Sequence, residues 1–543
     1  MGMQIVITII KIALKILHKV LVFTGGYILV IYFLVIGYLA DQVYKDIQEP
    51  KWVDIIVIGV LAICLIIMLL TTIQNIIRLV RPDFSIISLI SARRRVRRKE
   101  VGEKFEKVDK QFVGLESGVV LGKLKREYLV MPQNTEGHIM VIGGQGSGKS
   151  SCVAIPTLLN YNGSIFAVDI KGELSESRKD YAVGNIKIFN PVNSTSPHYD
   201  PYVVLSEGNK IQSVREMAQS IVKITKEDKD PYWKQSAQNL LIACILNFEN
   251  QNMDFPQTCK AIMSNNIKEL LELLEASPVT EVQLFINQFV GADEKQLASI
   301  YSTLANEIIL FATDEDIMRS LSRNDDLIIP SDLERMTDIF IKIDEDKLEQ
   351  WKPLLNLMVS QFLKSFEKRK NNNSEKILFM LDEFARLGKI ENITNGLATL
   401  RSKGIQIMII LQSLAQLDMI YGKDNRKVIT DNCNYKIILN ASDSDTQEYF
   451  SKLVGTVDIE KKSISASKKA TDIINNNGVS KSSEEKRIIK PEAFAYLEQP
   501  VVFTPSGYFR PNKVKWYEDK IFLERANNNY CAFWLITAPK IME

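Results

Sequence analysis

The amino-acid sequence predicts an α/β protein whose mostly parallel sheet is covered by helices on both faces. Three observations predict this fold. They are short apolar runs that alternate with helix-compatible segments, a glycine-rich loop between a strand and a helix, and an apolar run that ends in two acids. The apolar runs predict buried strands at residues 138–142, 164–169, 338–343, 376–381, 405–411 and 435–439. Nearly continuous apolar strands of this kind are typical of parallel sheets.

The glycine-rich loop follows the first of these strands. It consists of Gly143, Gly144, Gln145, Gly146, Ser147, Gly148, Lys149, Ser150 and Ser151. The run matches the P-loop pattern G-x-x-x-x-G-K-[ST], and it lies between a strand and a helix, as the pattern requires. Backbone N–H groups of such a loop hold phosphate oxygens. Lys149 would reach the β- and γ-phosphates of ATP, and the Ser150 hydroxyl would bind Mg²⁺. The alternative is a glycine turn that arose by chance.

The strand at residues 376–381 is followed by Asp382 and Glu383, which is a Walker B pattern. Asp382 at the strand end can hold the hydration shell of Mg²⁺. Glu383 can orient and deprotonate the attacking water, which an ATP hydrolase requires beside the γ-phosphate. Apolar residues followed by two acids are common by themselves, but the P-loop makes this pattern specific.

Two more polar residues follow predicted strands, at the edge of an open α/β sheet where ligands bind. Asp169 could contact the magnesium shell, or it could cap the next turn, and the sequence leaves both open. Gln412 could sense the γ-phosphate and transmit its loss. A strand-end side chain that bonds to the backbone is the alternative for Gln412.

The interval between the two motifs is too long for a bare nucleotide-binding core. Residues 205–325 are rich in polar-amphipathic helix patterns and poor in strand-like runs, which predicts an inserted all-α domain. It would separate the first part of the nucleotide-binding domain, 131–204, from the second part, 326–543. We expect the insertion to be a cargo receptor; structural padding or an oligomer contact is the alternative. Residues 459–488 are rich in Lys, Ser and Asn, which predicts a mobile segment.

The N-terminal part is expected to lie in a membrane. Residues 20–40 and 55–77 carry no charged side chain, and each run reaches the length of about 20 residues that crosses a bilayer. Residues 1–80 are therefore predicted to form a transmembrane hairpin, and 81–130 a basic linker that enters the core. Basic residues flank both ends of the hairpin, which places both termini in the cytoplasm. The basic run at 93–99 would bind anionic headgroups, and nucleic acid is the alternative.

Composition adds little about partners. The net charge is +2, so composition alone gives no argument for a nucleic-acid partner. The 6 cysteines and 3 histidines are dispersed, which predicts neither a zinc site nor a disulfide framework. Dispersed cysteines suit a reducing compartment.

Taken together, these motifs resemble the type IV coupling proteins, the TraG/TraD-like ATPases of conjugation and type IV secretion. The resemblance extends over nearly the whole chain, beginning with the paired apolar runs. It rests on Gly-Gly-Gln-Gly-Ser-Gly-Lys-Ser-Ser at 143–151, Asp-x-Lys-Gly-Glu at 169–173, Asp-Glu-Phe-x-x-Leu-Gly at 382–388 and Leu-Gln-Ser-x-x-Gln-Leu at 411–417. The last two blocks, in this order and at this spacing, are more specific than the P-loop alone.

The resemblance implies a homo-hexamer with RecA-like nucleotide-binding domains, anchored in a bacterial cytoplasmic membrane. The ring would use ATP and Mg²⁺, receive a relaxase–DNA complex or a protein effector, and deliver it to the type IV secretion channel. Contact with DNA would be electrostatic and not sequence-specific. In such rings an arginine of the next subunit stabilises charge on the γ-phosphate. Arg401 resembles that arginine finger, and Arg386 is the second candidate. The chain ends soon after the core, which shifts cargo recognition toward the insertion.

Three functions follow as expectations. The first is a motor enzyme that couples ATP hydrolysis to the transfer of DNA or of DNA with attached protein. A DNA translocase of the FtsK type is a close variant, although its additional spans and C-terminal DNA-reading module are not evident in this sequence. The third is a docking receptor that nucleotide binding gates, without pumping. Glu383 favours the motor, because nucleotide binding alone would not need it.

Overall fold

The computed structural model describes residues 108–527, apart from 207–208, 225–227, 372, 374, 391 and 467–476. The predicted hairpin at 1–80 and the basic run at 93–99 lie outside the described residues. In the part of the chain that the structure describes, no helix has both the length and the apolar character of a membrane span.

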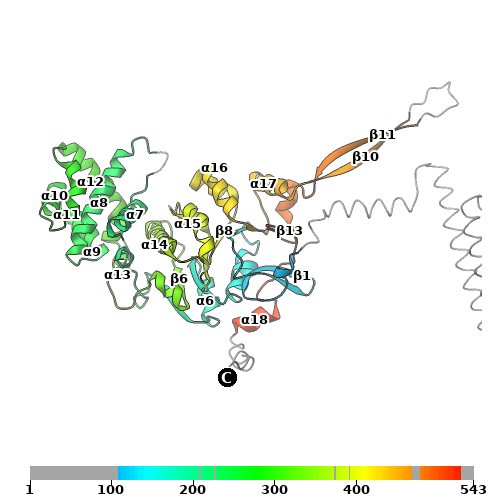
Figure 1. Ribbon diagram of the computed structural model, residues 1–543, viewed down its shortest axis with the longest axis horizontal. Helices are drawn as coiled ribbons and strands as arrows, with labels where there is room; N and C mark the ends of the chain where they lie inside the picture. Colours follow the sequence, from blue (N-terminus) through cyan, green and yellow to red (C-terminus); the bar gives the residue numbers. More distant parts are fainter. Residues whose placement is uncertain are drawn as a thin grey trace, which may run out of the picture. The chain divides into compact units, whose positions relative to one another are not determined.

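Within the described residues, a nine-stranded sheet forms the centre of the fold (Figure 1). In spatial order its strands are β13 (Gly507–Phe509), β12 (Val501–Thr504), β9 (Tyr435–Ile438), β3 (Ile139–Ile142), β8 (Ile405–Leu411), β7 (Ile377–Leu381), β4 (Ser164–Asp169), β6 (Thr337–Lys342) and β5 (Asn185–Phe189). The strands from β9 to β5 are parallel, and β12 and β13 continue the sheet in antiparallel fashion. The expected α/β fold with a mostly parallel sheet is confirmed. Because β3, β8, β7 and β4 are neighbours, the segments that follow them meet at one edge.

Alternate residues of each central strand face two separate apolar cores. In β3, Met140 and Ile142 belong to one core, and Ile139 and Val141 belong to the other. All four side chains are fully buried. The strand is therefore apolar throughout, since a parallel sheet that is covered on both faces leaves no side for polar residues.

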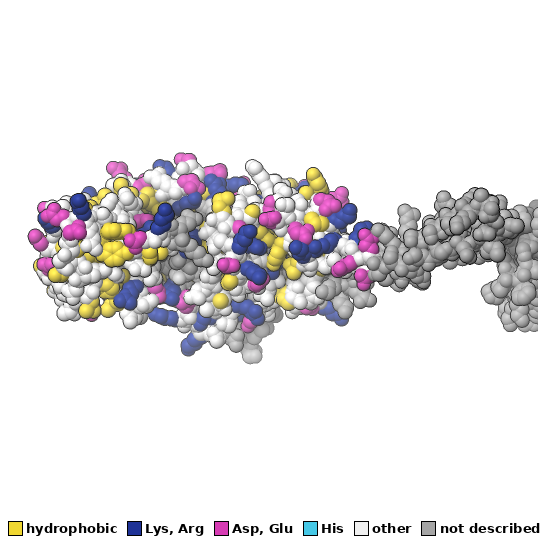
Figure 2. Space-filling view, turned by 90° about the horizontal axis from the view of Figure 1, so that it is seen from above, with side chains coloured by type: hydrophobic (Ala, Val, Ile, Leu, Met, Phe, Trp, Pro, Cys, Tyr) yellow, Lys and Arg dark blue, Asp and Glu magenta, His cyan; other side chains and the backbone are white. Residues whose placement is uncertain are grey.

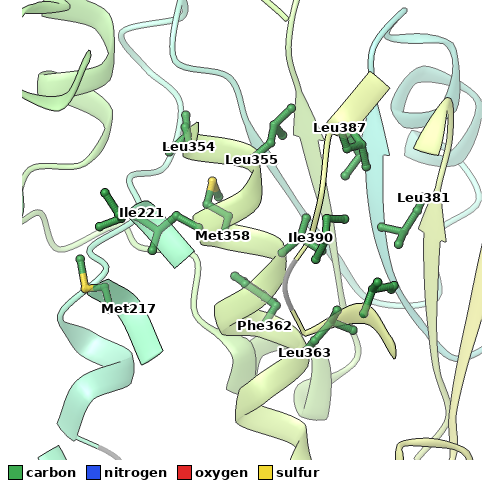
Figure 3. Packing of buried hydrophobic residues seen from close by; sticks show 14 of the residues in the cluster. Met217, Ile221, Leu354, Leu355, Met358, Phe362, Leu363, Leu381, Leu387 and Ile390 are labelled. Atoms are coloured by element: carbon green, nitrogen blue, oxygen red, sulfur yellow. The ribbon is translucent and has the colours of Figure 1, made fainter. Parts of the chain in front are cut away.

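On one face, α14 (Lys352–Ser365) lies between the sheet and α7 (Lys210–Ile221). Met217 and Ile221 of α7 point toward α14, where Met358 and Phe362 are part of the same cluster (Figure 3). Phe362 also contacts Phe166 of β4, with ring centroids 4.6 Å apart. One continuous core thus joins the sheet to the helices that leave it.

The described chain between the adjacent strands β5 and β6 contains helices and no strand. These helices are α7, α8 (Tyr232–Asn250), α9 (Phe255–Ser264), α10 (Ile267–Glu275), α11 (Thr280–Ile286), α12 (Glu294–Thr313) and α13 (Glu315–Ser320). Asp254, Asn266 and Asp293 cap α9, α10 and α12 by accepting backbone N–H bonds. In α10, Glu269 bonds back to the backbone of Asn266 and completes a capping box. The helix starts are therefore fixed by local sequence.

The other helices and strands lie outside the nine-stranded sheet. They are α5 (Ile155–Leu158), α6 (Glu173–Lys179), α15 (Ile393–Thr399), α16 (Leu414–Asn432), α17 (Ser444–Val454), α18 (Lys520–Ala526) and the antiparallel pairs β1 (Gly118–Leu124) with β2 (Glu127–Pro132) and β10 (Thr456–Ala466) with β11 (Asn477–Arg487). The β10–β11 pair lies in the segment for which the composition predicted a mobile chain. The structure instead forms a regular ladder there on both sides of residues 467–476.

Candidate nucleotide site

The P-loop connects β3 to a π-helical turn, Lys149–Ala154, which continues into α5. Lys149 is buried, and its ammonium donates to the carbonyl oxygens of Gly143 at 2.8 Å and Gly144 at 3.2 Å. Burial lowers the pKa of Lys149, while the negative charges of Glu383 and Asp382 oppose this shift. The structure thus brings the P-loop lysine and both Walker B acids within electrostatic reach of each other.

Two glycines of the loop lie close to neighbouring side chains. Gly148 has φ of +99°, and a Cβ there would lie 2.7 Å from the sulfur of Cys152. A Cβ on Gly143 would lie 2.3 Å from the hydroxyl oxygen of Ser147. A Cβ at Gly143 or Gly148 would therefore displace the Ser147 or Cys152 side chain, and the φ of Gly148 is one that other residues rarely adopt.

The residues present fit a polyphosphate with Mg²⁺. The loop supplies backbone donors at the start of a helical segment, and the hydroxyl oxygen of Ser147 is buried there without a hydrogen-bond partner. Ser150 and Asp382 offer the oxygen ligands that Mg²⁺ prefers. Among the described residues no group of three or more His, Cys, Asp or Glu could hold a metal ion. Mg²⁺ usually binds through few protein groups together with phosphate and water.

Asp382 follows β7 and is 8% exposed. Its carboxylate accepts a bond of 2.9 Å from the backbone N–H of Glu383. Burial and the neighbouring charge of Glu383 raise the pKa of Asp382 to about 6, against the opposing effect of Lys149 and Lys171. Asp382 is therefore mostly ionised at neutral pH and poised to lose that charge in mild acid.

Glu383 adopts a left-handed backbone conformation, with φ of 45°. This conformation costs a residue other than glycine roughly 1–2 kcal/mol, and such strain gathers at functional sites. The side-chain amide of Gln412, which follows β8, donates to the Glu383 carboxylate at 3.2 Å. The Gln412 side chain thus contacts Glu383, the candidate general base, and this disfavours the alternative of a side chain bonded only to backbone.

Asp169 serves local structure. Its carboxylate accepts bonds from the backbone N–H of Ser175 at 2.8 Å and from its hydroxyl at 2.7 Å, in the first turns of α6. Of the two alternatives that the sequence left open, these bonds support the turn cap. Lys171, two residues later, acts electrostatically on both Lys149 and Asp382. Lys171 lies in the Asp-x-Lys-Gly-Glu block, but the sequence pattern assigned it no role of its own.

Residues that the sequence did not identify hold the P-loop from outside. The Asn440 side chain accepts a bond of 2.6 Å from the N–H of Gly144. The Lys513 ammonium donates to the carbonyl oxygen of Ser147 at 3.1 Å. Asn440 comes shortly after a predicted strand, so its place at the ligand edge could have been inferred. No local pattern marks Lys513.

Arg401 lies at the opposite edge of the sheet, before β8 begins. It pairs with Glu136 at 3.3 Å, and both side chains are 49% exposed. With Gln406 and neighbouring residues they line a cavity of about 110 Å³. A strand of this length spans about 20 Å, so Arg401 cannot reach the P-loop of its own chain. Arg386 is at the nucleotide edge, where it pairs with Glu345 at 2.5 Å.

Sequence comparison gives related proteins over most of the chain. The family model described as "Type IV secretory system Conjugative DNA transfer" matches residues 86–533. Protein VirD4 of Rhizobium radiobacter is 26% identical over 400 residues, which cover 70% of this chain and 57% of VirD4. Conjugal transfer protein TraG of Escherichia coli is 26% identical over 482 residues, 79% of this chain and 74% of TraG. The chain thus spans less than two thirds of the length of VirD4.

Solved structures with the same fold include the conjugative coupling protein TrwB. Its unbound form, TrwBdeltaN70, aligns with a TM-score of 0.59 and 19% identity over 75% of this chain and 89% of TrwBdeltaN70. TrwB in complex with ADP and Mg²⁺ aligns with a TM-score of 0.57 and 19% identity, over 71% of this chain and 87% of that one. At these identities the likeness shows a shared fold.

Proposed function

Because the chain belongs to the type IV secretory system conjugative DNA transfer family, we propose that it is a coupling ATPase. It binds ATP with Mg²⁺, recruits a relaxase–DNA complex or a protein effector, and delivers this cargo to a type IV secretion channel. One observation carries the ATPase part of this proposal. Lys149, Asp382, Glu383 and Gln412 come from three different strand ends and meet at one edge of the sheet.

Each residue has a role that its surroundings support. Lys149 and the loop N–H groups bind the phosphates, and ionised Asp382 with the Ser150 hydroxyl holds Mg²⁺, which offsets phosphate charge. Glu383 accepts a proton from the attacking water. The amide of Gln412 orients the Glu383 carboxylate through the bond of 3.2 Å, so it can report a change at the γ-phosphate to the following helix, α16.

The decisive experiment is Glu383→Gln in the full chain. We expect this variant to bind ATP within about threefold of wild type but to hydrolyse it at least about 100-fold more slowly, because the proton acceptor is lost. Glu345→Gln is the matched control, since Glu345 contacts Arg386 rather than Gln412. Conjugative transfer should be lost with hydrolysis. Transfer at the wild-type rate in Glu383→Gln would contradict the motor and favour the docking receptor.

We also propose a head-to-tail homo-hexamer in which Arg401 completes the site of the next subunit. The position of Arg401 supports this, since it lies at the edge opposite its own P-loop. A head-to-tail interface joins two different surfaces and closes into a ring. Residues 20–40 and 55–77 would anchor the ring in the bacterial cytoplasmic membrane, with both termini in the cytoplasm.

The helices between β5 and β6 are proposed to be a separate cargo-receptor domain, approximately residues 205–325. Leu284 and Val290 are each 72% exposed there. On the face shown in Figure 2, hydrophobic side chains are exposed over the helical end and also over the other part of the described chain, with basic and acidic side chains among them. Exposed apolar residues of this kind are typical of protein-binding surfaces.

A double variant tests the receptor role. Leu284→Glu with Val290→Glu should reduce capture of cargo protein by at least about tenfold and leave ATP binding unchanged, because both side chains are far more exposed than core residues. Met419→Glu is the control, since Met419 is 86% exposed on α16. Unchanged capture by the double variant would remove the role assigned to this surface.

A further inference from the structure

A segment near the C-terminal end of the described chain is fixed against the P-loop. Asn512 and Lys123 of β1 exchange two backbone bonds, of 2.7 and 2.9 Å. Val514 is 2% exposed and packs in the core that also contains Cys152 of the P-loop helix. The N–H of Trp516 donates to the carbonyl oxygen of Ser151 at 3.1 Å. Residues 512–516 are therefore held on both sides of Lys513.

Lys513 uses this fixed position to bind the loop itself. Its ammonium donates to the carbonyl oxygen of Ser147 at 3.1 Å. That carbonyl belongs to the peptide unit between Ser147 and Gly148, and the described chain contains no cis peptide bonds. In a planar trans peptide, C=O and N–H point in opposite directions. A bond that fixes the Ser147 carbonyl toward Lys513 therefore fixes the Gly148 N–H on the other side of the peptide plane.

The Ser147–Gly148 peptide has little local restraint of its own. Gly148 has φ of +99° and no side chain to hold its conformation. A flexible glycine peptide would lose conformational entropy when a phosphate orders it. Lys149 anchors the beginning of the loop through Gly143 and Gly144, whereas Lys513 anchors its end.

We propose that Lys513 is a positioning residue of the polyphosphate site, which orients the Ser147–Gly148 peptide before nucleotide binds. The inference rests on the proposed nucleotide site and adds a cation that the P-loop pattern does not contain. The P-loop backbone binds the phosphates equally in the ground state and in the transition state. Lys513 therefore stabilises both states of bound ATP to the same extent. It lowers the KM for ATP without raising kcat.

The test compares three variants of the full chain by ATP and ADP titration and by steady-state hydrolysis. Lys513→Met should weaken ATP and ADP binding alike, by about tenfold, and raise KM to the same extent while kcat stays within about twofold. Lys513→Arg keeps a donor and should recover most of the affinity. Lys515→Met is the matched control, because Lys515 pairs with Glu518 at 2.7 Å and not with the loop.

The outcomes separate this inference from the proposed function. If Lys149→Ala binds ATP like wild type, the nucleotide site itself is refuted. If Lys149→Ala fails to bind and Lys513→Met behaves like Lys515→Met, only the role of Lys513 is refuted. A fall in kcat with unchanged KM, or no recovery in Lys513→Arg, would also overturn it.

Discussion

The two edges of the central sheet differ in what they contain. The carboxyl edge gathers Lys149, Asp382, Glu383 and Gln412, whose charges and hydrogen bonds act on each other. The amino edge carries Arg401, which is half exposed and bound to Glu136 alone among acidic side chains of the described residues. One edge therefore gathers the residues of the nucleotide site, and the other presents the half-exposed Arg401. This difference is what a ring needs if each subunit donates one edge to its neighbour.

Mixing two inactive variants gives the largest expected effect. Lys149→Ala removes the phosphate lysine and Arg401→Ala removes the cation of the other edge, so each alone should lower hydrolysis by at least about 100-fold. In an equimolar mixture, some interfaces combine the intact nucleotide edge of one variant with the intact Arg401 of the other. Measurable recovery of ATPase activity is expected.

The control for this experiment is Arg386→Ala, which removes the second candidate for the finger. It should retain activity without any second variant, because Arg386 pairs with Glu345 at the nucleotide edge and does not lie at the edge that carries Arg401. If the Lys149→Ala and Arg401→Ala mixture stays inactive, Arg401 acts within its own subunit or not at all, and the two-edge comparison fails.

The edges also differ in their response to pH. His138 at the amino edge is fully buried, and its Nδ1 accepts a bond of 3.0 Å from the N–H of Ile407. Burial lowers the pKa of His138 to about 4, against about 6.5 in the unfolded chain. Between these values the unfolded chain binds a proton that the folded chain excludes. The contribution of His138 to the free energy of unfolding is therefore fully present above about pH 6.5, and it falls as the pH decreases toward 4.

We expect the free energy of unfolding to fall by about 1–2 kcal/mol from this group between about pH 7 and pH 5. Denaturant unfolding of wild type and His138→Asn at both pH values measures this fall, since asparagine can accept the same bond without titrating. The free energy of unfolding of wild type, relative to that of His138→Asn, should be lower at pH 5 than at pH 7. A difference independent of pH would show that His138 is not kept neutral by burial.

Substitution in the loop tests the nucleotide edge directly. Gly148→Ala adds a Cβ at a position with φ of +99°, where it would lie 2.7 Å from the sulfur of Cys152. ATP affinity should fall by at least about tenfold. Gly146→Ala is the matched control, because Gly146 also has a positive φ, of +72°, but nothing lies within 4 Å of a Cβ built there. Equal losses of affinity in the two variants would mean that backbone strain, and not space, limits the loop.

The smallest effect is expected for Glu136→Gln. The Arg401–Glu136 pair is 3.3 Å long and half exposed on both sides, and such pairs contribute less than about 1 kcal/mol. Thermal unfolding should therefore change little. A destabilisation clearly above that value would show that the Arg401–Glu136 pair has a structural role and that Arg401 is not available to a partner subunit.

The strands and both nucleotide motifs were predictable because their signals are local. β3, β4, β7 and β8 are short runs of apolar residues, and this composition is required by burial on both faces. β5 was not predicted. It lies at the end of the sheet, and of its five side chains only Phe189 is buried, so its Asn-Ile-Lys-Ile-Phe run is a weaker strand signal.

Within the site, the sequence pattern predicted which polar residue follows each strand. It did not decide whether Asp169 is a magnesium ligand or a turn cap, since both roles need an acid after a strand. The two bonds from Ser175 distinguish these roles, and Ser175 is too ordinary a residue to be singled out in the sequence. Lys513 was missed for a related reason, because it is more than 360 residues from Ser147 along the chain.

The sequence by itself determined the glycine loop, the paired acids and the parallel sheet, because backbone geometry and strand burial restrict residue types within a few positions. Tertiary structure alone decided which strand ends are neighbours, that the Gln412 amide meets Glu383, that Lys513 reaches the loop, and that Arg401 lies at the far edge. These contacts depend on strand order and packing between distant segments, and neither leaves a periodic pattern in the chain.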